Sequence, residues 1–529
     1  AVVPLAMPLQ LRRRSSPLLA RGPAVGVAVA SVVGFCLGRG PKVAASLAPW
    51  GPRLYTKGPL CSVRIRPRLT RPSTSSAISS EAAPLPQLLT LHPYRALWRL
   101  AWPTIIIALL RTSYGIIDSF WIGCLGVNEL EAMGASSFAV WLLLLTGEVA
   151  CLGVHAVAAV CEGAGERNGV GKAVVQGLWF SVFCGILTLF LVPLIGAYFQ
   201  LVGVGHRPAV VAAGTAYLRL LIWGTAPMTA CGVLASGFKG VAELRPVLIV
   251  NVVCVLLNFA LDPLFIWGGF GLRPMGVGGA AVATNLCAVV ATLISFKLLQ
   301  WQGVTLDPAP PSRSALQRIV KIGLPISLGG IAFTFIYICL GHLLSSMGGF
   351  YLAALGLGHK VEAMAFTVTE GFGAAAATLV GQWLGAGREK EARESSIRAA
   401  IVAAAVMVPF ALIFQVFAHP LVAIFTQDPD TILAATSYLR IVSFCFPFMG
   451  IEHVMDGSLM AAGDTVPSFL TGLLCNTARI PLSIWLAPKY GVSAVWLVIV
   501  TTTVAKALVK RWAFRRSRLP LLARGQQVA

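Results

Sequence analysis

The sequence has few charged residues, and acidic ones are especially scarce. Of 529 residues only 20 are Asp or Glu and 12% carry any charge, whereas 57% are hydrophobic. Soluble domains have about 25% charged residues, so this chain has too little polar surface to cover a water-soluble globule. The composition excludes a soluble enzyme and predicts an all-α integral membrane protein, because a helix satisfies its own backbone hydrogen bonds in lipid.

Closely spaced cysteines are also missing. The twelve cysteines stand singly, and nowhere do two residues alone separate a pair. Structural zinc sites and disulfide frameworks need short, repeated cysteine spacings. We therefore expect small buried thiols, no disulfide framework and no bound metal.

Residues 1–80 contain no acidic residue at all. They contain twelve Lys or Arg and end in a Ser-rich stretch, a composition typical of an organelle transit peptide. An apolar stretch over 24–37 is too short to cross a hydrocarbon core about 30 Å thick. We expect a targeting leader over 1–80, cleaved or disordered, that directs the protein to a plastid envelope. The mitochondrion and the plasma membrane are the alternatives.

The net charge of +21 falls to +9 once the leader is set aside, since 29 basic and 20 acidic residues remain. The basic residues follow no pattern of a nucleic-acid-binding groove with interleaved aromatic residues. Charge next to a membrane is the ordinary explanation. We expect membrane lipid as a partner, no nucleic acid and a monomeric protein.

Long apolar stretches begin at Trp98, and each of the twelve has 20 or more residues. This length is enough to span a bilayer as a helix. Loops on one side, with both ends, carry 21 Lys or Arg, and the opposite loops carry three. Both termini should therefore face the cytoplasm, or the stroma in a plastid. The predicted spans are 98–124, 134–160, 175–200, 214–236, 247–268, 277–300, 318–346, 352–383, 397–420, 433–460, 466–487 and 490–513.

The chain repeats itself after about 222 residues. With that shift Pro103 meets Pro325, Glu148 meets Glu370 and residues 163–165 meet 385–387. A shift of 218 brings Asn258 onto Asn476. Six spans per copy make the repeats parallel, and two such bundles can rock against each other in alternating access. The predicted domains are an N-terminal bundle at 95–300, a linker at 301–317, a C-terminal bundle at 318–513 and a basic tail at 514–529.

These landmarks resemble the multidrug and toxic-compound extrusion (MATE) family over about residues 95–513. The resemblance is carried by the sequences DSFWIGCLG from Asp118, GAGER from Gly163, the stretch 258–263 and LVGQWLGAG ending at Gly387. It implies a V-shaped pair of six-helix bundles and a secondary antiporter for multidrug efflux. Such a protein exports small organic solutes in exchange for H⁺ or Na⁺ and has no cofactor. The segment near Gly356 is most similar to the bacterial and DNA-damage-inducible type branch.

Three polar residues in the first repeat are candidates for the coupling site. Asp118 lies in the first span, and Asn258 and Asp262, four residues apart, share one face of the fifth. Ionisable groups inside a membrane are costly, so they mark functional sites by default. Two carboxylates and an amide supply the oxygen ligands that small cations prefer, and burial would favour proton uptake. The resemblance adds Thr284 of the sixth span to this cation-coupling set.

The second repeat lacks these acids, because Leu340 and Ile480 stand at the positions of Asp118 and Asp262. This asymmetry favours a single coupling site. Pro103, fifteen residues before Asp118, cannot donate a backbone hydrogen bond. It is a candidate helix-bending residue, and bending there could transmit the effect of protonation to the cleft. Alternatively, Pro103 makes a static kink.

The second repeat has acids of its own. Three of them are candidates for a substrate site that would suit a cationic solute, or for a second proton site: Glu362, Glu452 and Asp456. Lys360 and Arg440 could instead neutralise them. Glu148 and Glu370, at equivalent positions, are expected to be structural, as are His155 and His342.

Three other functions fit the sequence less well. Primary transport is set aside because no phosphate-binding loop is present. A membrane transferase would need acids at one interface, and the nearest cluster there, Asp428 with Asp430, is typical of a helix cap. A lipid or lipid-linked-oligosaccharide flippase would need several cations in the cavity, and only Arg111 and Arg479 could serve. We therefore expect a transporter and no catalytic site.

Overall fold

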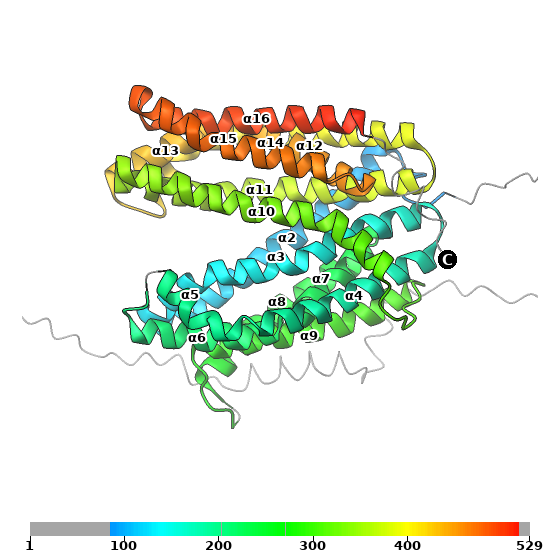
Figure 1. Ribbon diagram of the computed structural model, residues 1–529, viewed down its shortest axis with the longest axis horizontal. Coiled ribbons are helices and arrows are strands. Elements are labelled where there is room, and N and C mark those ends of the chain that lie inside the picture. Colours follow the sequence, from blue (N-terminus) through cyan, green and yellow to red (C-terminus); the bar gives the residue numbers. More distant parts are fainter. Residues whose placement is uncertain (1–84, 203, 270, 518–529) are drawn as a thin grey trace, which may run out of the picture. The chain divides into compact units, whose positions relative to one another are not determined.

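The computed structural model describes residues 85–202, 204–269 and 271–517. The predicted leader and the tail beyond residue 517 lie outside the described residues. Within them the chain is helical, with one isolated backbone bridge between Gly269 and Leu272 and no strand. Figure 1 shows α3–α9 on one side and α10–α16 on the other. This arrangement confirms the predicted all-α membrane fold.

The N-terminal bundle consists of helices from the first repeat. Helix α2 contacts α8 on one side and α11 of the second repeat on the other. The bounds are α2 Pro93–Gly123, α3 Val127–Gly163, α4 Arg167–Leu189, a short 3₁₀ turn η3 Val192–Leu194, α5 Ile195–Leu201, α6 Pro208–Trp223, α7 Thr225–Gly240, α8 Arg245–Trp267 and α9 Val277–Trp301.

The C-terminal bundle repeats this order. Its largest apolar cluster includes residues of α11 to α14 and α16, and Phe372 of α11, Tyr438 of α13 and Trp496 of α16 are fully buried in it. The bounds are α10 Arg313–Met347, α11 Gly349–Gly385, α12 Glu389–Ala423, α13 Pro429–Ser443, α14 Phe446–Ala462, α15 Val466–Tyr490 and α16 Val492–Arg516.

Three of the twelve predicted spans are not single helices. The span over 175–200 consists of α4, η3 and α5, which together count as one of ten segments long and apolar enough to cross a membrane. The other two are bent pairs: α6 and α7 meet at 50°, and α13 and α14 at 57°. A bend thus divides each of the predicted spans over 214–236 and 433–460, and the total of twelve spans holds when each bent pair is one span.

A proline just after each break explains the bends. Pro227 is the third residue of α7 and Pro447 the second residue of α14. Proline has no backbone N–H and its ring collides with the preceding turn, so the earlier helix cannot run through it unchanged. The two breaks fall at matching places in the two repeats, and the bend therefore belongs to the duplicated unit.

Glycines let the bundles approach closely at one end. A Cβ on Gly163 of α3 would collide with the backbone of Gln382, and one on Gly385 of α11 with that of Val160. Hydrogen bonds reinforce the contact: Thr378 donates to the carbonyl of Lys239 at 3.0 Å and Gln382 to that of Gly240 at 2.9 Å. These residues lie at the helix ends that carry the basic loops.

The segment between the repeats, 302–312, lies along α4. The Gln176 side chain donates to the carbonyl of Pro310 at 3.0 Å and accepts from the backbone N–H of Ser312 at 2.8 Å. The Trp179 indole donates to the carbonyl of Ala309 at 2.8 Å. The linker is therefore held by side chains of the N-terminal bundle.

Candidate functional site

The four residues predicted for cation coupling come together inside the N-terminal bundle. Asp118 lies in the second half of α2, Asn258 and Asp262 on one face of α8, and Thr284 in α9. Helix α8 packs against both α2 and α9. Asn258 and Asp262 are fully buried and Asp118 is 6% exposed.

The polar groups of this cluster contact one another directly. The Asn258 amide donates to Asp262 Oδ1 at 3.0 Å, and the Thr284 hydroxyl lies 3.5 Å from Asp118 Oδ2. The contact between Thr284 and Asp118 joins α9 to α2, and the Asn258 amide holds Asp262 on α8.

Three oxygens of the cluster have no partner. Asp118 Oδ1, Asn258 Oδ1 and Asp262 Oδ2 are buried and accept no hydrogen bond. Among the residues that the structure describes, no Lys, Arg or His forms an ion pair with either aspartate. Buried acceptors without a donor are costly, and buried carboxylates normally pair or bind a cation. These oxygens suit a proton or a small, hard cation.

The matching positions in the C-terminal bundle are uncharged, and a buried cation lies next to one of them in the sequence. Leu340 is fully buried there, and Asn476 keeps a buried amide oxygen without a partner. The nearby Arg479 is 2% exposed. Its guanidinium donates to Thr502 and Thr503 of α16 at 2.9 Å each and to the Tyr337 hydroxyl of α10 at 2.8 Å. It therefore ties three helices together.

Glu452 and Asp456 of α14 pair with lysines of α16. Lys506 and Lys510 lie 3.0 and 2.8 Å from Glu452, and Lys510 lies 2.8 Å from Asp456. Each pair is four residues apart, so two charged helix faces oppose each other. The lysines are only 7% and 4% exposed.

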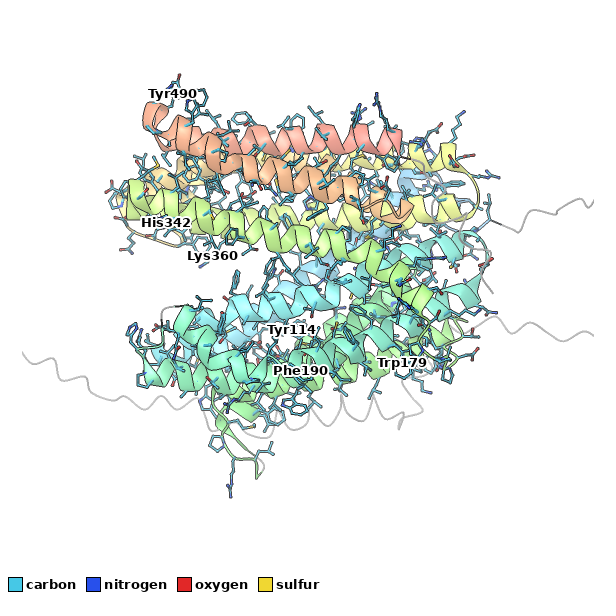
Figure 2. All side chains as sticks on the ribbon, viewed as in Figure 1. Tyr114, Trp179, Phe190, His342, Lys360 and Tyr490 are labelled. Carbon is cyan, nitrogen blue, oxygen red and sulfur yellow. The ribbon has the colours of Figure 1, made fainter. Side chains whose placement is uncertain are left out.

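Two sequence interpretations are corrected by this pairing. Lys360 and Arg440 do not neutralise Glu452 and Asp456; both are exposed, and Lys360 lies on the side of the C-terminal bundle facing the other bundle (Figure 2). Lys506 and Lys510, counted above among the 21 basic residues of the loops and ends, lie inside the bundle.

The remaining predicted residues lie apart from the cation cluster. Glu362 accepts a hydrogen bond from the Tyr438 hydroxyl at 2.7 Å. Pro103 is buried within the continuous helix α2, where the next residue, Thr104, reaches the carbonyl of Gly371 across the bundle interface at 3.2 Å. Asp428 caps α13 as predicted, accepting from the Thr431 backbone N–H at 3.0 Å.

Comparisons with known proteins agree with this architecture. The family model described as MatE matches the chain twice, over residues 103–264 and 325–485. The two matches begin 222 residues apart, since 325 − 103 = 222, which is the shift of the internal repeat. A relative described as "Probable multidrug resistance protein NorM" from Thermotoga maritima is 26% identical over 79% of this chain and 91% of its own length.

Solved structures share the fold. A structure described as MATE in the bent conformation superimposes with a TM-score of 0.75 at 23% identity, covering 83% of this chain and 98% of its own. Another, described as the outward-facing conformation of a multidrug resistance MATE family transporter, has a TM-score of 0.74 at 23% identity, with 82% and 98% covered.

Proposed function

Because this chain belongs to the MATE family of multi-pass membrane transporters, we propose that it is a secondary antiporter. It exports an organic solute in exchange for H⁺ or Na⁺, and Asp118, Asn258, Asp262 and Thr284 bind the coupling ion. The single observation that carries the proposal is the set of three buried oxygens without partners on Asp118, Asn258 and Asp262.

The chemistry of the cluster supports a reversible ion site. Two carboxylates without a basic partner repel each other in a medium of low dielectric constant. Binding H⁺ or Na⁺ removes this repulsion and fills the empty acceptors. Releasing the ion restores the repulsion and leaves the buried acceptors without partners again. Ion binding and release therefore change the free energy of the N-terminal bundle substantially. Such a change can drive a conformational cycle only where the ion binds one conformation better than the other.

The arrangement of the bundles supports alternating access. Their glycine contacts and hydrogen bonds gather at the end with the basic loops, which the positive-inside rule assigns to the cytoplasm or stroma. We assign this structure to an outward-facing state. Pro103 lies beside the bundle interface in α2, where bending would link the ion site to the contact between bundles.

The charged residues of the C-terminal bundle have a structural role in this proposal. Glu452 and Asp456 are matched by Lys506 and Lys510, and Glu362 is held by Tyr438. Matched charges gain little from binding a further cation.

Within the cell, the acid-free leader supports delivery to a plastid envelope, and the branch resembling bacterial and DNA-damage-inducible type members is the assignment we favour.

The test uses the full chain in proteoliposomes. Efflux of ethidium, an organic cation, is followed under an imposed H⁺ or Na⁺ gradient. We expect one gradient to accelerate efflux, and Asp262→Asn to reduce this acceleration at least about tenfold, because a lost charged ligand is worth roughly 1.5–3 kcal/mol. Asp118→Asn should behave in the same way.

The matched control is Asp430→Asn, the same chemical change at an exposed position in the first turn of α13. It should retain the response of the unmodified chain. An Asp262→Asn protein that is folded and still responds fully to the gradient would refute the site. Movement of a fluorescent lipid without any gradient dependence would favour a flippase.

A further inference from the structure

His155 of α3 is a buried titratable residue that the proposed ion site does not use. It is 3% exposed, and its Nε2 lies 2.9 Å from the hydroxyl oxygen of Thr378 in α11. That hydroxyl donates in turn to the backbone carbonyl of Lys239, near the end of α7, at 3.0 Å. His155 and Lys239 belong to the N-terminal bundle and Thr378 to the C-terminal bundle. These hydrogen bonds therefore hold the bundles together at the inner end, the end that carries the basic loops.

The number of protons available decides which group donates in this contact. A threonine hydroxyl has a single proton, and that of Thr378 is directed to the carbonyl of Lys239 or of Ala374, at 3.0 and 3.3 Å. The Thr378 oxygen then accepts from Nε2 of His155, so Nε2 carries a proton. The neutral ring therefore completes the contact, and a second proton, on Nδ1, would make the ring a cation.

The packing around His155 leaves little room for water. One turn further along α3, a Cβ on Gly240 of α7 would collide with Ala158, and one on Gly381 of α11 would collide with Ala159. Among the described residues, no carboxylate lies within ion-pair distance of His155. A buried charge without water or a counter-ion is costly. The closed contact therefore favours the neutral ring.

The charged residues of the packed helices do not change this conclusion. Lys239 is the single charged residue of α7, and its positive charge opposes a second one on His155. Other charged residues on the helices that pack against α3 include the cations Lys172, Arg318 and Lys321, the acids Glu162, Glu452 and Asp456, which are paired with basic residues, and Glu370, two turns before Thr378.

The contact is present in one copy although the scaffold is duplicated. The shift of 222 residues places Ala377 at the position of His155 and Ala156 at that of Thr378. Both alanines are fully buried in an apolar cluster with Met460 of α14. The inner end is therefore closed by an apolar contact on one side and by a titratable polar contact on the other.

We propose that His155 is a pH sensor that regulates the opening of the inner end. Neutral His155 holds the two bundles together there, and protonated His155 favours their separation. The proton binds better to the open state, because separation of the bundles lets water reach the imidazolium, and a ligand shifts an equilibrium toward the state that it binds better. Acidification of the cytoplasm or stroma therefore favours the inward-open state. This regulation rests on the proposed alternation between two states but not on the ion site.

The experiment measures a distance across the inner end in the full chain in lipid nanodiscs. Spin labels replace two exposed residues, Glu166 before α4 and Lys390 of α12. Asp118→Asn and Asp262→Asn form the background, which removes the titration of the ion site. We expect the ratio of open to closed molecules to rise about tenfold between about pH 8 and about pH 5.5, a range that includes the ordinary titration of histidine.

Substitution of His155 should remove this pH response. In the same background His155→Gln keeps an N–H donor for Thr378 but cannot take up a proton, so the inner end should stay closed at both pH values. Lys239→Gln removes the neighbouring positive charge and should reduce the response. The matched control is His342→Gln, at an exposed position in α10, which should leave the response unchanged.

Three results would overturn the sensor. These are an unchanged pH response in His155→Gln, no pH response in the background that retains His155, and an inner end that His155→Gln leaves open at both pH values. The ion site is tested separately by the gradient dependence of efflux. Failure of that site would leave the pH response of the distance in place, so the two failures can be told apart.

Discussion

The two bundles carry buried acids under opposite conditions. In the N-terminal bundle Asp118 and Asp262 lie together with three oxygens unpartnered and no basic residue paired to them in the described chain. In the C-terminal bundle Glu452 and Asp456 face Lys506 and Lys510 at 2.8–3.0 Å. Arg479 lies near the position where the first bundle has Asp262. One duplicated scaffold thus contains an unbalanced acidic pair and a balanced charge cluster.

Under the proposed function, the unbalanced pair serves ion binding and the balanced cluster serves stability. An unbalanced pair in low dielectric is costly until a cation arrives, so it is suited to exchange. A balanced cluster already has its counter-ions, and removing one of them leaves another buried without a partner. Replacing an acid by its amide should therefore have opposite consequences for stability in the two bundles.

The largest expected effect on stability comes from Glu452→Gln. Lys506 would lose its ion-pair partner while 7% exposed, and breaking a buried pair costs about 3–5 kcal/mol. We expect a clearly lower thermal unfolding temperature in detergent. Asp262→Asn removes an unpaired buried charge and should leave that temperature equal or higher.

A double variant sharpens this comparison. Glu452→Gln with Lys506→Met removes both partners, and much of the lost stability should return, because an apolar pair can replace a buried ion pair at little cost. If Glu452→Gln is as stable as the original chain, or if Asp262→Asn is the less stable of the two, the contrast between the bundles is wrong.

An intermediate effect is expected where the bundles touch. Gly385→Ala places a methyl group against the Val160 backbone, and overpacking of this kind costs about 1–3 kcal/mol. The contact at the basic end should loosen. Spin labels on the exposed residues Lys172 and Lys390 would report a longer distance across that end.

The matched control is Gly472→Ala in α15, where an added methyl group meets open space. It should leave the distance between the labels unchanged. An unchanged distance in Gly385→Ala would mean that the tight glycine contact does not hold the bundles together.

The smallest effect is expected at the surface, where Asp428 caps α13. The Thr431 N–H and hydroxyl donate to its carboxylate and lower its pKa below the ordinary 3.8. The cap is therefore present at neutral pH and is lost as the pH falls below about 4 through the lowered pKa. Asp428→Ala should speed hydrogen exchange of the Thr431 amide at neutral pH, whereas Asp428→Asn should preserve most of the protection. Equal exchange rates of the Thr431 amide in all three proteins would mean that the Asp428 side chain does not cap α13.

The helical spans and the ion cluster could be predicted from sequence because both depend on local patterns. Runs of 20 apolar residues identify spans without any knowledge of packing. Asn258 and Asp262 share a helix face by their spacing alone. Asp118 was added to them as an ionisable residue inside the first span, and the absence of both acids from the second repeat sharpened the assignment; in the structure the Thr284 hydroxyl lies 3.5 Å from Asp118 Oδ2.

The breaks and the lysine pairing were missed for different physical reasons. Averaged hydropathy passes smoothly over the bends after Trp223 and Ser443, although Pro227 and Pro447 were available as signals. Lys506 and Lys510 were counted with the basic residues of the loops and ends that orient the bundle, so no partner inside the bundle was assigned to them. Their four-residue spacing, matching that of Glu452 and Asp456, was the overlooked signal. Arg479 could not be paired from sequence, since its partners are hydroxyl groups on two other helices.

The hydrogen bonds along the linker determine where the two halves can pivot. Gln176 and Trp179 hold the linker by hydrogen bonds as far as Ser312. The linker therefore moves together with the N-terminal bundle. Any swing of the second half must take up its torsion at the start of α10, around Arg313. A short linker held in this way limits how far the two bundles can translate relative to each other. Rotation of one bundle against the other therefore costs less free energy than translation.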